Sequence, residues 1–384
     1  MTETRLFKPL QIGPIQVQHR IGMAPLTRRR ATPDRIPNPM MKEYYTQRAS
    51  VPGTLIITEG TLISAAAAGG FPSAPGIWRA DQIAAWKEIT DAVHERGSFI
   101  YVQLFGMGRA AEAAVATSEG IEIVAPSAVP IPYDENPDAP TPRAMSRAEI
   151  QQTIVDFVTA AQNARAAGFD GVEIHGANGY LLDQFLQDTS NQRDDEYGGS
   201  VANRSRLLHE VLQAVVEVMS ADRVGLRLSP WSQFQGMRME DPVPQFADIV
   251  DRARGLDLAY LSLVEARIFG AWVDEGSSVE EEETLDFAFE RWNGPILVAG
   301  DYGLEKARRL VDEQYPNKEI VVLFGRHFIS NPDLVYRFKE GVELTRYQRE
   351  TFYEIGSARG YVDYPFSEEF SLYGTEKYLE SGSQ

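Results

Sequence analysis

The sequence predicts a (β/α)8 barrel, a fold in which eight parallel strands close into a ring surrounded by helices. Short apolar runs recur eight times along the chain, and an amphipathic stretch follows nearly every one of them. The chain of 384 residues also has a suitable length for one large barrel with loop insertions. We therefore expect a single domain over residues 1–384.

The apolar runs consist mainly of β-branched and aliphatic residues. Strands that are buried on both faces, as in a parallel sheet, have this nearly continuous apolar pattern. In chain order, the predicted strands cover residues 20–26, 55–60, 99–105, 171–175, 224–229, 258–265, 296–300 and 320–325.

The predicted helices cover residues 81–96, 146–167, 203–219, 242–254, 304–314 and 332–339. In the first of them, Ile83, Trp86, Ile89 and Val93 share one face, and Gly97 is a stop signal. In the second, Ser146 and Glu149 have the spacing of a capping box.

Two segments exceed the minimal barrel. Residues 6–17 predict a small hairpin with a Gly-Pro turn, which we expect to plug the barrel floor. Residues 106–143, after the third strand, contain six prolines that would stiffen the segment. An insertion of this length after a barrel strand lies on the catalytic face, so we interpret residues 106–145 as a lid or pocket wall.

Composition excludes several functions. The net charge of −18 argues against nucleic-acid binding, because an acidic surface repels phosphate backbones. The absence of cysteine excludes thiolate catalysis and zinc–thiolate or iron–sulfur sites. No apolar run approaches the roughly 20 residues that cross a bilayer, and the N-terminus lacks a signal-peptide pattern. We expect a cytoplasmic monomer or homodimer with no membrane partner.

His175 and Asn178 follow the fourth predicted strand directly, at the end of the barrel where active sites lie. In a helical turn, residues three apart lie on one side, so both neutral donors would point at one oxygen. A lone histidine here would more often be structural, but the matching asparagine favours a site. No metal site is predicted: the other histidines do not end strands, and the Glu280–Glu283 run is interpreted as a solvated helix start.

Gly300 and the Gly325-Arg326 pair follow strands seven and eight, where barrels commonly bind phosphate through backbone N–H groups. Arg326 could add a bidentate contact. Arg227 lies inside an apolar strand and needs an anionic partner. That partner could be an internal carboxylate or an anionic ligand, and composition does not decide between them.

Several runs resemble the motifs of the Old Yellow Enzyme family, in order, from about residue 5 to about residue 366. The longest is His-Gly-Ala-Asn-Gly-Tyr-Leu-Leu-Asp-Gln-Phe-Leu, residues 175–186. The others are residues 23–28, 57–60, 102–104, 195–200, 203–204 and 324–334.

The resemblance implies FMN, bound without a covalent link at the barrel mouth, and NADPH as hydride donor. It places Pro25, Leu26, Thr27, Gly60 and Gln103 beside the flavin ring, Arg227 at its N1/C2 edge, and Gly300, Asp301, Gly325 and Arg326 at the phosphate. Arg227 would thereby gain an anion, since reduced flavin carries negative charge.

The implied reaction is the ping-pong reduction of the activated C=C bond of an α,β-unsaturated aldehyde or ketone. His175 and Asn178 would bind the carbonyl oxygen, and Tyr180 would protonate the α-carbon. The resemblance implies that Phe71, Phe105, Phe269 and Tyr353 line the substrate pocket.

The chain departs from the family pattern at three positions. Leu323 stands where many relatives have glycine, Asp301 where asparagine is common, and Phe105 where several have tryptophan. Three alternatives stay open. They are a flavin-free lyase or isomerase acting on a phosphorylated substrate, a flavin-binding protein without turnover, and a biosynthetic specialist acting on one fungal-type metabolite.

Overall fold

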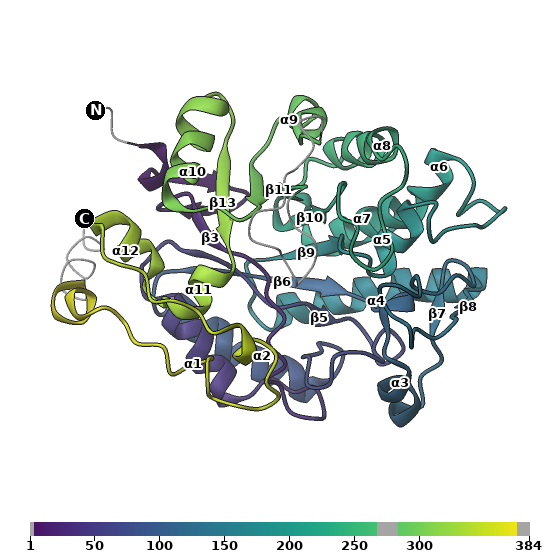
Figure 1. Cartoon of the computed structure of the whole chain (residues 1–384), viewed down its shortest axis with the longest axis horizontal. Helices are drawn as coiled ribbons and strands as arrows, with labels where there is room; N and C mark the ends of the chain where they lie inside the picture. The colour runs from purple at the N-terminus through teal and green to yellow at the C-terminus, as the bar shows by residue number, and fades with distance from the viewer. Residues whose placement is uncertain (1–3, 267–282, 375–384) are drawn as a thin grey trace.

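The computed structural model describes residues 4–266 and 283–374, and within them the predicted (β/α)8 barrel is confirmed. Every pairing in the main sheet is parallel, and the β4–β6 pairing closes the ring (Figure 1). The barrel strands are β3 (Ile21–Met23), β4 (Leu55–Ile57), β6 (Phe99–Phe105), β9 (Gly171–Gly176), β10 (Val224–Leu228), β11 (Tyr260–Val264), β12 (Ile296–Ala299) and β13 (Ile320–Phe324).

Several strands are shorter than predicted. The first was expected over residues 20–26, but β3 ends at Met23, and the Ala24 N–H donates the last hydrogen bond, to the Phe324 carbonyl. Pro25 follows and has no N–H with which to continue the ladder. The strand predicted over residues 258–265 likewise shortens to β11.

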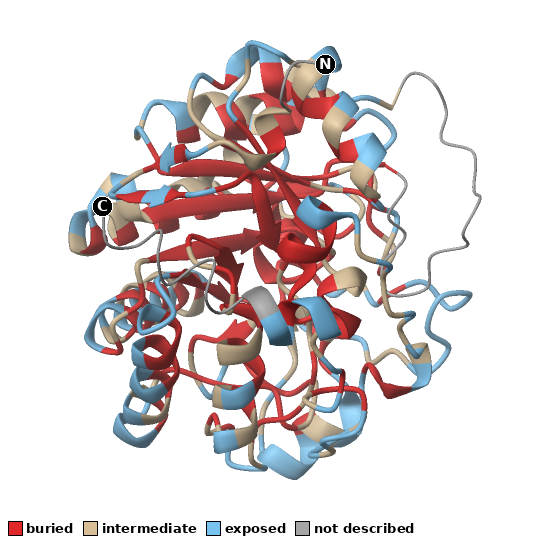
Figure 2. Ribbon diagram, turned by 90° about the vertical axis from the view of Figure 1, so that its left-hand side faces the viewer, coloured by how far each residue is buried: buried red, intermediate tan, exposed pale blue. Residues whose placement is uncertain are grey.

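Helices surround the ring, and most of them turn a buried face toward it and an exposed face outward (Figure 2). They are α1 (Pro39–Arg48), α2 (Ala80–His94), α4 (Arg147–Ala166), α5 (Leu181–Leu186), α6 (Val201–Arg204), α7 (Arg206–Met219), α8 (Val243–Arg254), α9 (Asp286–Arg291), α10 (Leu304–Arg309), α11 (Arg326–Ser330) and α12 (Leu334–Glu340). The helix predicted over 203–219 is split into α6 and α7, and the one over 304–314 ends in a π-turn at Leu310–Gln314.

The capping box predicted before α4 is present. The Ser146 side chain accepts a hydrogen bond from the Glu149 N–H, and the Ser146 N–H donates to Glu149 Oε2 over 2.7 Å. Both contacts satisfy N–H groups that the first helical turn leaves without a partner.

The predicted N-terminal hairpin consists of β1 (Leu10–Ile12) and β2 (Ile15–Val17), joined through Gly13 in the left-handed region. Ile12 and Val17 belong to one buried apolar cluster with Tyr101, Tyr260 and other barrel-interior residues. The hairpin therefore closes the floor of the barrel.

Two glycines make room for large rings in the barrel interior. A β-carbon on Gly225 would lie 2.2 Å from the Tyr260 ring, and one on Gly171 would lie 2.2 Å from the Tyr101 ring. The two rings lie 5.5 Å apart, so these tyrosines fill the lower barrel opposite the glycines. Their packing separates the floor from the mouth.

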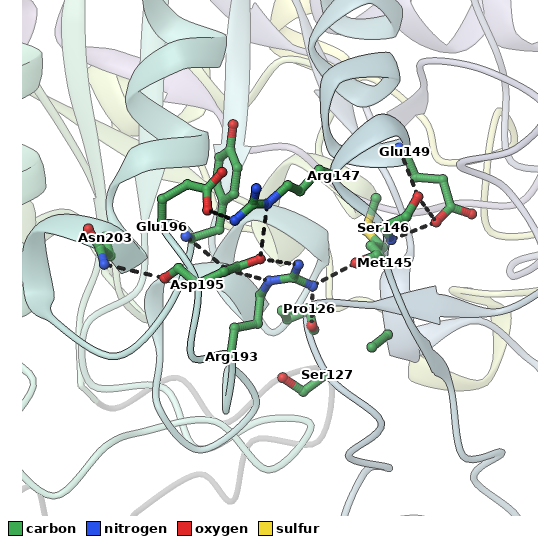
Figure 3. A network of polar contacts seen from close by, with 12 residues as sticks. Pro126, Ser127, Met145, Ser146, Arg147, Glu149, Arg193, Asp195, Glu196 and Asn203 are labelled. Carbon is green, nitrogen blue, oxygen red and sulfur yellow. Dashed lines mark hydrogen bonds and ion pairs between the residues drawn. The ribbon is translucent and has the colours of Figure 1, made fainter.

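The segment between β6 and α4 carries α3 (Ala113–Glu119) and the short strands β7 (Val124–Ala125) and β8 (Arg143–Ala144). Figure 3 shows how it is held. The Arg193 guanidinium donates to the Pro126 and Met145 carbonyls over 2.8 and 2.7 Å and pairs with Asp195. The role of this segment as a lid stays a prediction.

Among the described residues, no helix has the length and apolar character needed to cross a membrane.

The glycine–tyrosine packing leads to a stability prediction. Gly225→Ala should lower the free energy of unfolding by about 1–3 kcal/mol, because the new methyl group overpacks the Tyr260 ring. Gly303→Ala is the matched control, since its β-carbon would meet no atom within 4 Å. Urea unfolding measures both, and equal stability of the two variants would contradict the packing argument.

Candidate active site

A cavity of about 740 Å3 opens at the C-terminal ends of the barrel strands. Among the predicted site residues, it is lined by Pro25, Leu26, Thr27, Gly60, Phe71, Gln103, His175, Asn178, Tyr180, Arg227, Gly300, Asp301, Gly325, Arg326 and Tyr353. Phe105 is not among the lining residues: its buried ring packs behind Tyr180, with centroids 5.1 Å apart. Phe269 lies outside the described residues.

A polar layer forms the base of this cavity. Gln103 donates to Glu173 over 2.7 Å, and Arg227 donates to Ser262 over 3.1 Å. Burial lowers the pKa of Arg227 and raises that of Glu173, and each charge counteracts the shift of the other. Arg227 thus has an internal anion, yet no described residue is a hydrogen-bond partner of its buried Nε, and its side chain still lines the cavity.

Glu173 was not among the residues predicted for the site. Its signal was an acidic residue two positions before His175, at the same inward register of a buried strand. The sequence alone did not give the pairing of β9 with β10, so it did not show that Glu173 and Arg227 both point into the barrel.

His175 is buried, and its pKa lies well below the ordinary value because of burial and then the nearby charge of Arg227. The imidazole is therefore neutral at physiological pH. Its Nδ1 has no hydrogen-bond partner among the residues that the structure describes. A neutral ring can donate one hydrogen bond to a ligand oxygen without carrying a full charge into the site.

Asn178 does not lie in a helical turn, as its spacing from His175 had suggested. Its φ is +56°, Gly179 follows at +74°, and α5 begins only at Leu181. The left-handed turn nevertheless places Asn178 on the cavity lining together with His175 and Tyr180. Asparagine tolerates this conformation better than most residues.

Tyr180 lies against His175, with ring centroids 5.1 Å apart, and edge-on to Phe71 at 6.2 Å. Burial, and then the neighbouring Tyr353, raises the pKa of its hydroxyl, while a hydrogen bond from Gln235 lowers it. The phenol therefore stays protonated at neutral pH and can act as a proton donor.

The opposite end of the cavity is formed by the loops after β12 and β13. A β-carbon on Gly325 would lie 2.9 Å from the Leu26 side chain, so the backbone approaches the cavity closely there. Arg326 forms an ion pair with Asp301, which is at φ +53°. The aspartate at this position thus partly neutralises the arginine expected to meet a phosphate.

A C-terminal strap, residues 347–361, forms one wall through Tyr347, Arg349, Phe352 and Tyr353. Buried arginines hold its main chain. Arg28 donates to the Phe352 and Gly360 carbonyls, and Arg30 donates to those of Thr351 and Phe352. Arg48 of α1 donates to the Tyr361 carbonyl. Of the residues in this wall, only Tyr353 was predicted from the sequence.

The residues present fit a flat, partly anionic cofactor such as FMN. The cavity provides the volume, the Arg227 Nε is a buried donor that meets no acceptor in residues 4–266 and 283–374, and glycine backbone borders the opposite end. The described residues contain no group of three or more His, Asp or Glu side chains placed to hold a metal ion.

A family model described as the NADH:flavin oxidoreductase / NADH oxidase family matches residues 5–345. The chain belongs to this family. FMN, predicted as the cofactor, is thereby confirmed. A solved structure titled as the old yellow enzyme homologue from Zymomonas mobilis (NCR) is 40% identical, with a TM-score of 0.85 over 94% of this chain and 99% of the other. The Old Yellow Enzyme resemblance is confirmed as well.

Three fungal relatives are also similar over nearly their whole length. Chanoclavine-I aldehyde reductase fgaOx3 of Penicillium roqueforti is 52% identical, covering 96% of this chain and 98% of the relative. A protein of Epichloe festucae var. lolii named "probable inactive reductase easA" is 50% identical, with 96% and 97% covered. NADP-dependent oxidoreductase lnbE of Aspergillus flavus is 48% identical, with 95% and 97% covered.

A buried carboxyl beside the cavity leads to a pH prediction. Burial raises the pKa of Glu59 to about 7, although a hydrogen bond from the Arg28 N–H opposes the shift. The native state therefore favours the protonated form, and stability is lost as pH rises from about 4.5 through about 7. Glu59→Gln should gain stability relative to wild type between about pH 5 and about pH 8. Urea unfolding of both proteins at each pH measures this gain. A difference in the free energy of unfolding that does not change with pH would contradict the argument.

The Arg326–Asp301 ion pair leads to a binding prediction. Asp301→Asn should tighten FMN binding by about threefold or more, because it removes a negative charge at the expected phosphate position and the ion pair that this charge forms with Arg326. Glu305→Gln is the matched control, since this nearby side chain is 79% exposed and pairs with Arg308. Fluorescence titration of FMN measures both, and weaker binding by the Asp301 variant would oppose this placement of the phosphate.

Proposed function

We propose that the protein is an ene-reductase that takes hydride from NADPH and reduces the C=C bond of α,β-unsaturated aldehydes or ketones by a ping-pong mechanism. The observation that carries the proposal is the common placement of His175, Asn178 and Tyr180 on one wall of the cavity. Two of them offer hydrogen-bond donors for a carbonyl oxygen, and the third offers a proton.

FMN would be held without a covalent bond by the ring, edge and phosphate residues named above, and it supplies hydride transfer between the nicotinamide and the double bond. His175 and Asn178 would bind the substrate carbonyl oxygen. Their hydrogen bonds strengthen as negative charge develops on that oxygen, so they favour the transition state over the ground state. Because His175 is neutral, it donates without becoming an acid that competes with Tyr180.

Tyr180 would deliver the proton to the α-carbon from its Oη and recover one from water afterwards. Its raised pKa keeps the hydroxyl protonated until the carbanion-like transition state forms. Phe71, Phe352 and Tyr353 surround the same space and would exclude water from a flat enone stacked there.

The choice of substrate and donor draws support from the relatives. One is named an aldehyde reductase and another NADP-dependent. Another relative is named "probable inactive reductase", which is the observation that favours the alternative of a flavin-binding protein without turnover. Turnover is favoured here because the donor pair and the phenol share one cavity. A flavin-free lyase acting on a phosphorylated substrate would leave Thr27 and Gln103 without a role toward a ligand.

Anaerobic half-reactions test the proposal. NADPH should bleach the flavin absorbance of the purified protein, and 2-cyclohexenone should restore it. Bleaching without recovery would favour the non-catalytic alternative, and no bleaching would sink the proposal. NADH in the same assay measures the nucleotide preference.

Tyr180→Phe should slow reoxidation by the enone about 100-fold or more, because it removes the general acid, while reduction by NADPH changes little. Tyr197→Phe is the control: this buried tyrosine also has a bonded hydroxyl, through Gln151 and Glu210, and does not line the cavity. Stopped-flow absorbance measures each half-reaction. Equal losses in both would refute the proton-donor role.

A further inference from the structure

The turn formed by Asn178, Gly179 and Tyr180 is held by side chains at its main-chain groups. Ser229 accepts from the Asn178 N–H over 2.7 Å, and Asp183 accepts from the Gly179 N–H over 2.8 Å. The other two contacts are donated to carbonyls. Gln235 donates to that of Asn178 over 2.9 Å, and Gln184 donates to that of Gly179 over 2.7 Å.

Such holding is needed because the turn is locally unfavourable. Asn178 and Gly179 both have positive φ, and such conformations persist when the surroundings over-determine them. A β-carbon on Gly179 would lie 2.8 Å from the Gln235 Cβ, so the turn and Gln235 are in close contact. Asn178 and Tyr180 directly precede and follow Gly179, so the placement of both side chains depends on the conformation of this turn.

Gln235 differs from the other three side chains in its origin. Ser229 directly follows β10, and Asp183 and Gln184 belong to α5, whereas Gln235 is supplied by the loop between β10 and α8. Its amide reaches back over the turn from a residue that is itself at φ +64° and only 8% exposed. It also lies within hydrogen-bonding reach of the Tyr180 hydroxyl.

Arg109, in the segment after β6, holds this loop in place. Its guanidinium donates to the Gln235 carbonyl over 2.8 Å and to the Pro130 carbonyl over 3.1 Å. Its N–H donates to Gln184 over 3.0 Å. The buried Arg109 therefore links the insertion, the β10–α8 loop and α5 at one point.

We propose that Gln235 is a positioning residue, which sets the Asn178–Tyr180 turn so that the carbonyl donor and the proton donor meet the same substrate. This inference rests on the proposed function. The role differs from general stabilisation because it acts on the half-reaction with the enone. Neither hydride transfer from NADPH nor reoxidation by oxygen uses the Tyr180 proton at the α-carbon.

Gln235→Met tests the role, since it keeps the length of the side chain and removes the amide. Reoxidation by 2-cyclohexenone should slow by about tenfold or more, while reduction by NADPH and reoxidation by oxygen should stay within about twofold of wild type. Gln235→Asn should behave similarly, because it suits a left-handed residue but is one methylene short. Gln235→Asn replaces Gln235→Met in these measurements if the Met variant does not fold.

Gln82→Met is the matched control. Gln82 is also fully buried and bonded to main chain, at Trp78 and Arg79 before α2, on another side of the barrel. It should leave the ratio of the two half-reactions unchanged. In the Tyr180→Phe background, Gln235→Met should lose most of its effect on the enone reaction, since both changes act on one unit.

Hydrogen–deuterium exchange gives a readout that does not depend on turnover. The peptide spanning residues 176–182 should exchange several times faster in Gln235→Met than in wild type, as the turn opens more often. Unchanged exchange, or equal slowing of all three flavin reactions, would overturn the positioning role. Wild-type protein that cannot be reoxidised by any enone would instead reject the proposed function and leave the exchange result standing.

Discussion

A charged side chain inside an apolar barrel must be compensated there, and Arg227 meets this requirement through Glu173 and Ser262. The layer that they form with Gln103 divides the interior. Below it, the hairpin and two large tyrosine rings fill the floor with apolar contacts. Above it, polar and aromatic side chains together line the cavity, and the same arginine that the layer stabilises is available to a bound cofactor. The boundary between structure and chemistry in this fold is therefore one layer of side chains.

Local patterns in the sequence were sufficient for the barrel. The apolar runs placed each barrel strand within a few residues, because burial on both faces leaves a continuous signal. Strand ends also indicated His175 and Arg227, since the barrel mouth is set by strand direction alone. Thr27 and Gln103 were also marked by their positions at predicted strands one and three. The resemblance assigned them to the flavin ring, and the structure brings both to the cavity.

Long-range contacts were not predictable in the same way. Asn178 was inferred from a helical spacing but is left-handed, because Ser229 and Gln235, 51 and 57 residues further along the chain, bind its main-chain N–H and carbonyl. Phe352 and Tyr347 lie far along the chain from the barrel strands, in a segment without a strong periodic pattern. Phe105 is the reverse case. The resemblance placed it in the pocket lining, but its ring packs against that of Tyr180 and is not among the lining residues.

The strap illustrates how a wall can be fixed in place without fixing its chemistry. Arg28, Arg30 and Arg48 bind its carbonyl oxygens, which every amino acid possesses. Replacement of a strap side chain therefore leaves these anchors intact. Over evolutionary time, such a wall can diverge among paralogues while its backbone path is inherited unchanged. The cavity would then acquire new selectivity through substitutions at a few positions, while His175, Asn178 and Tyr180 stay unchanged.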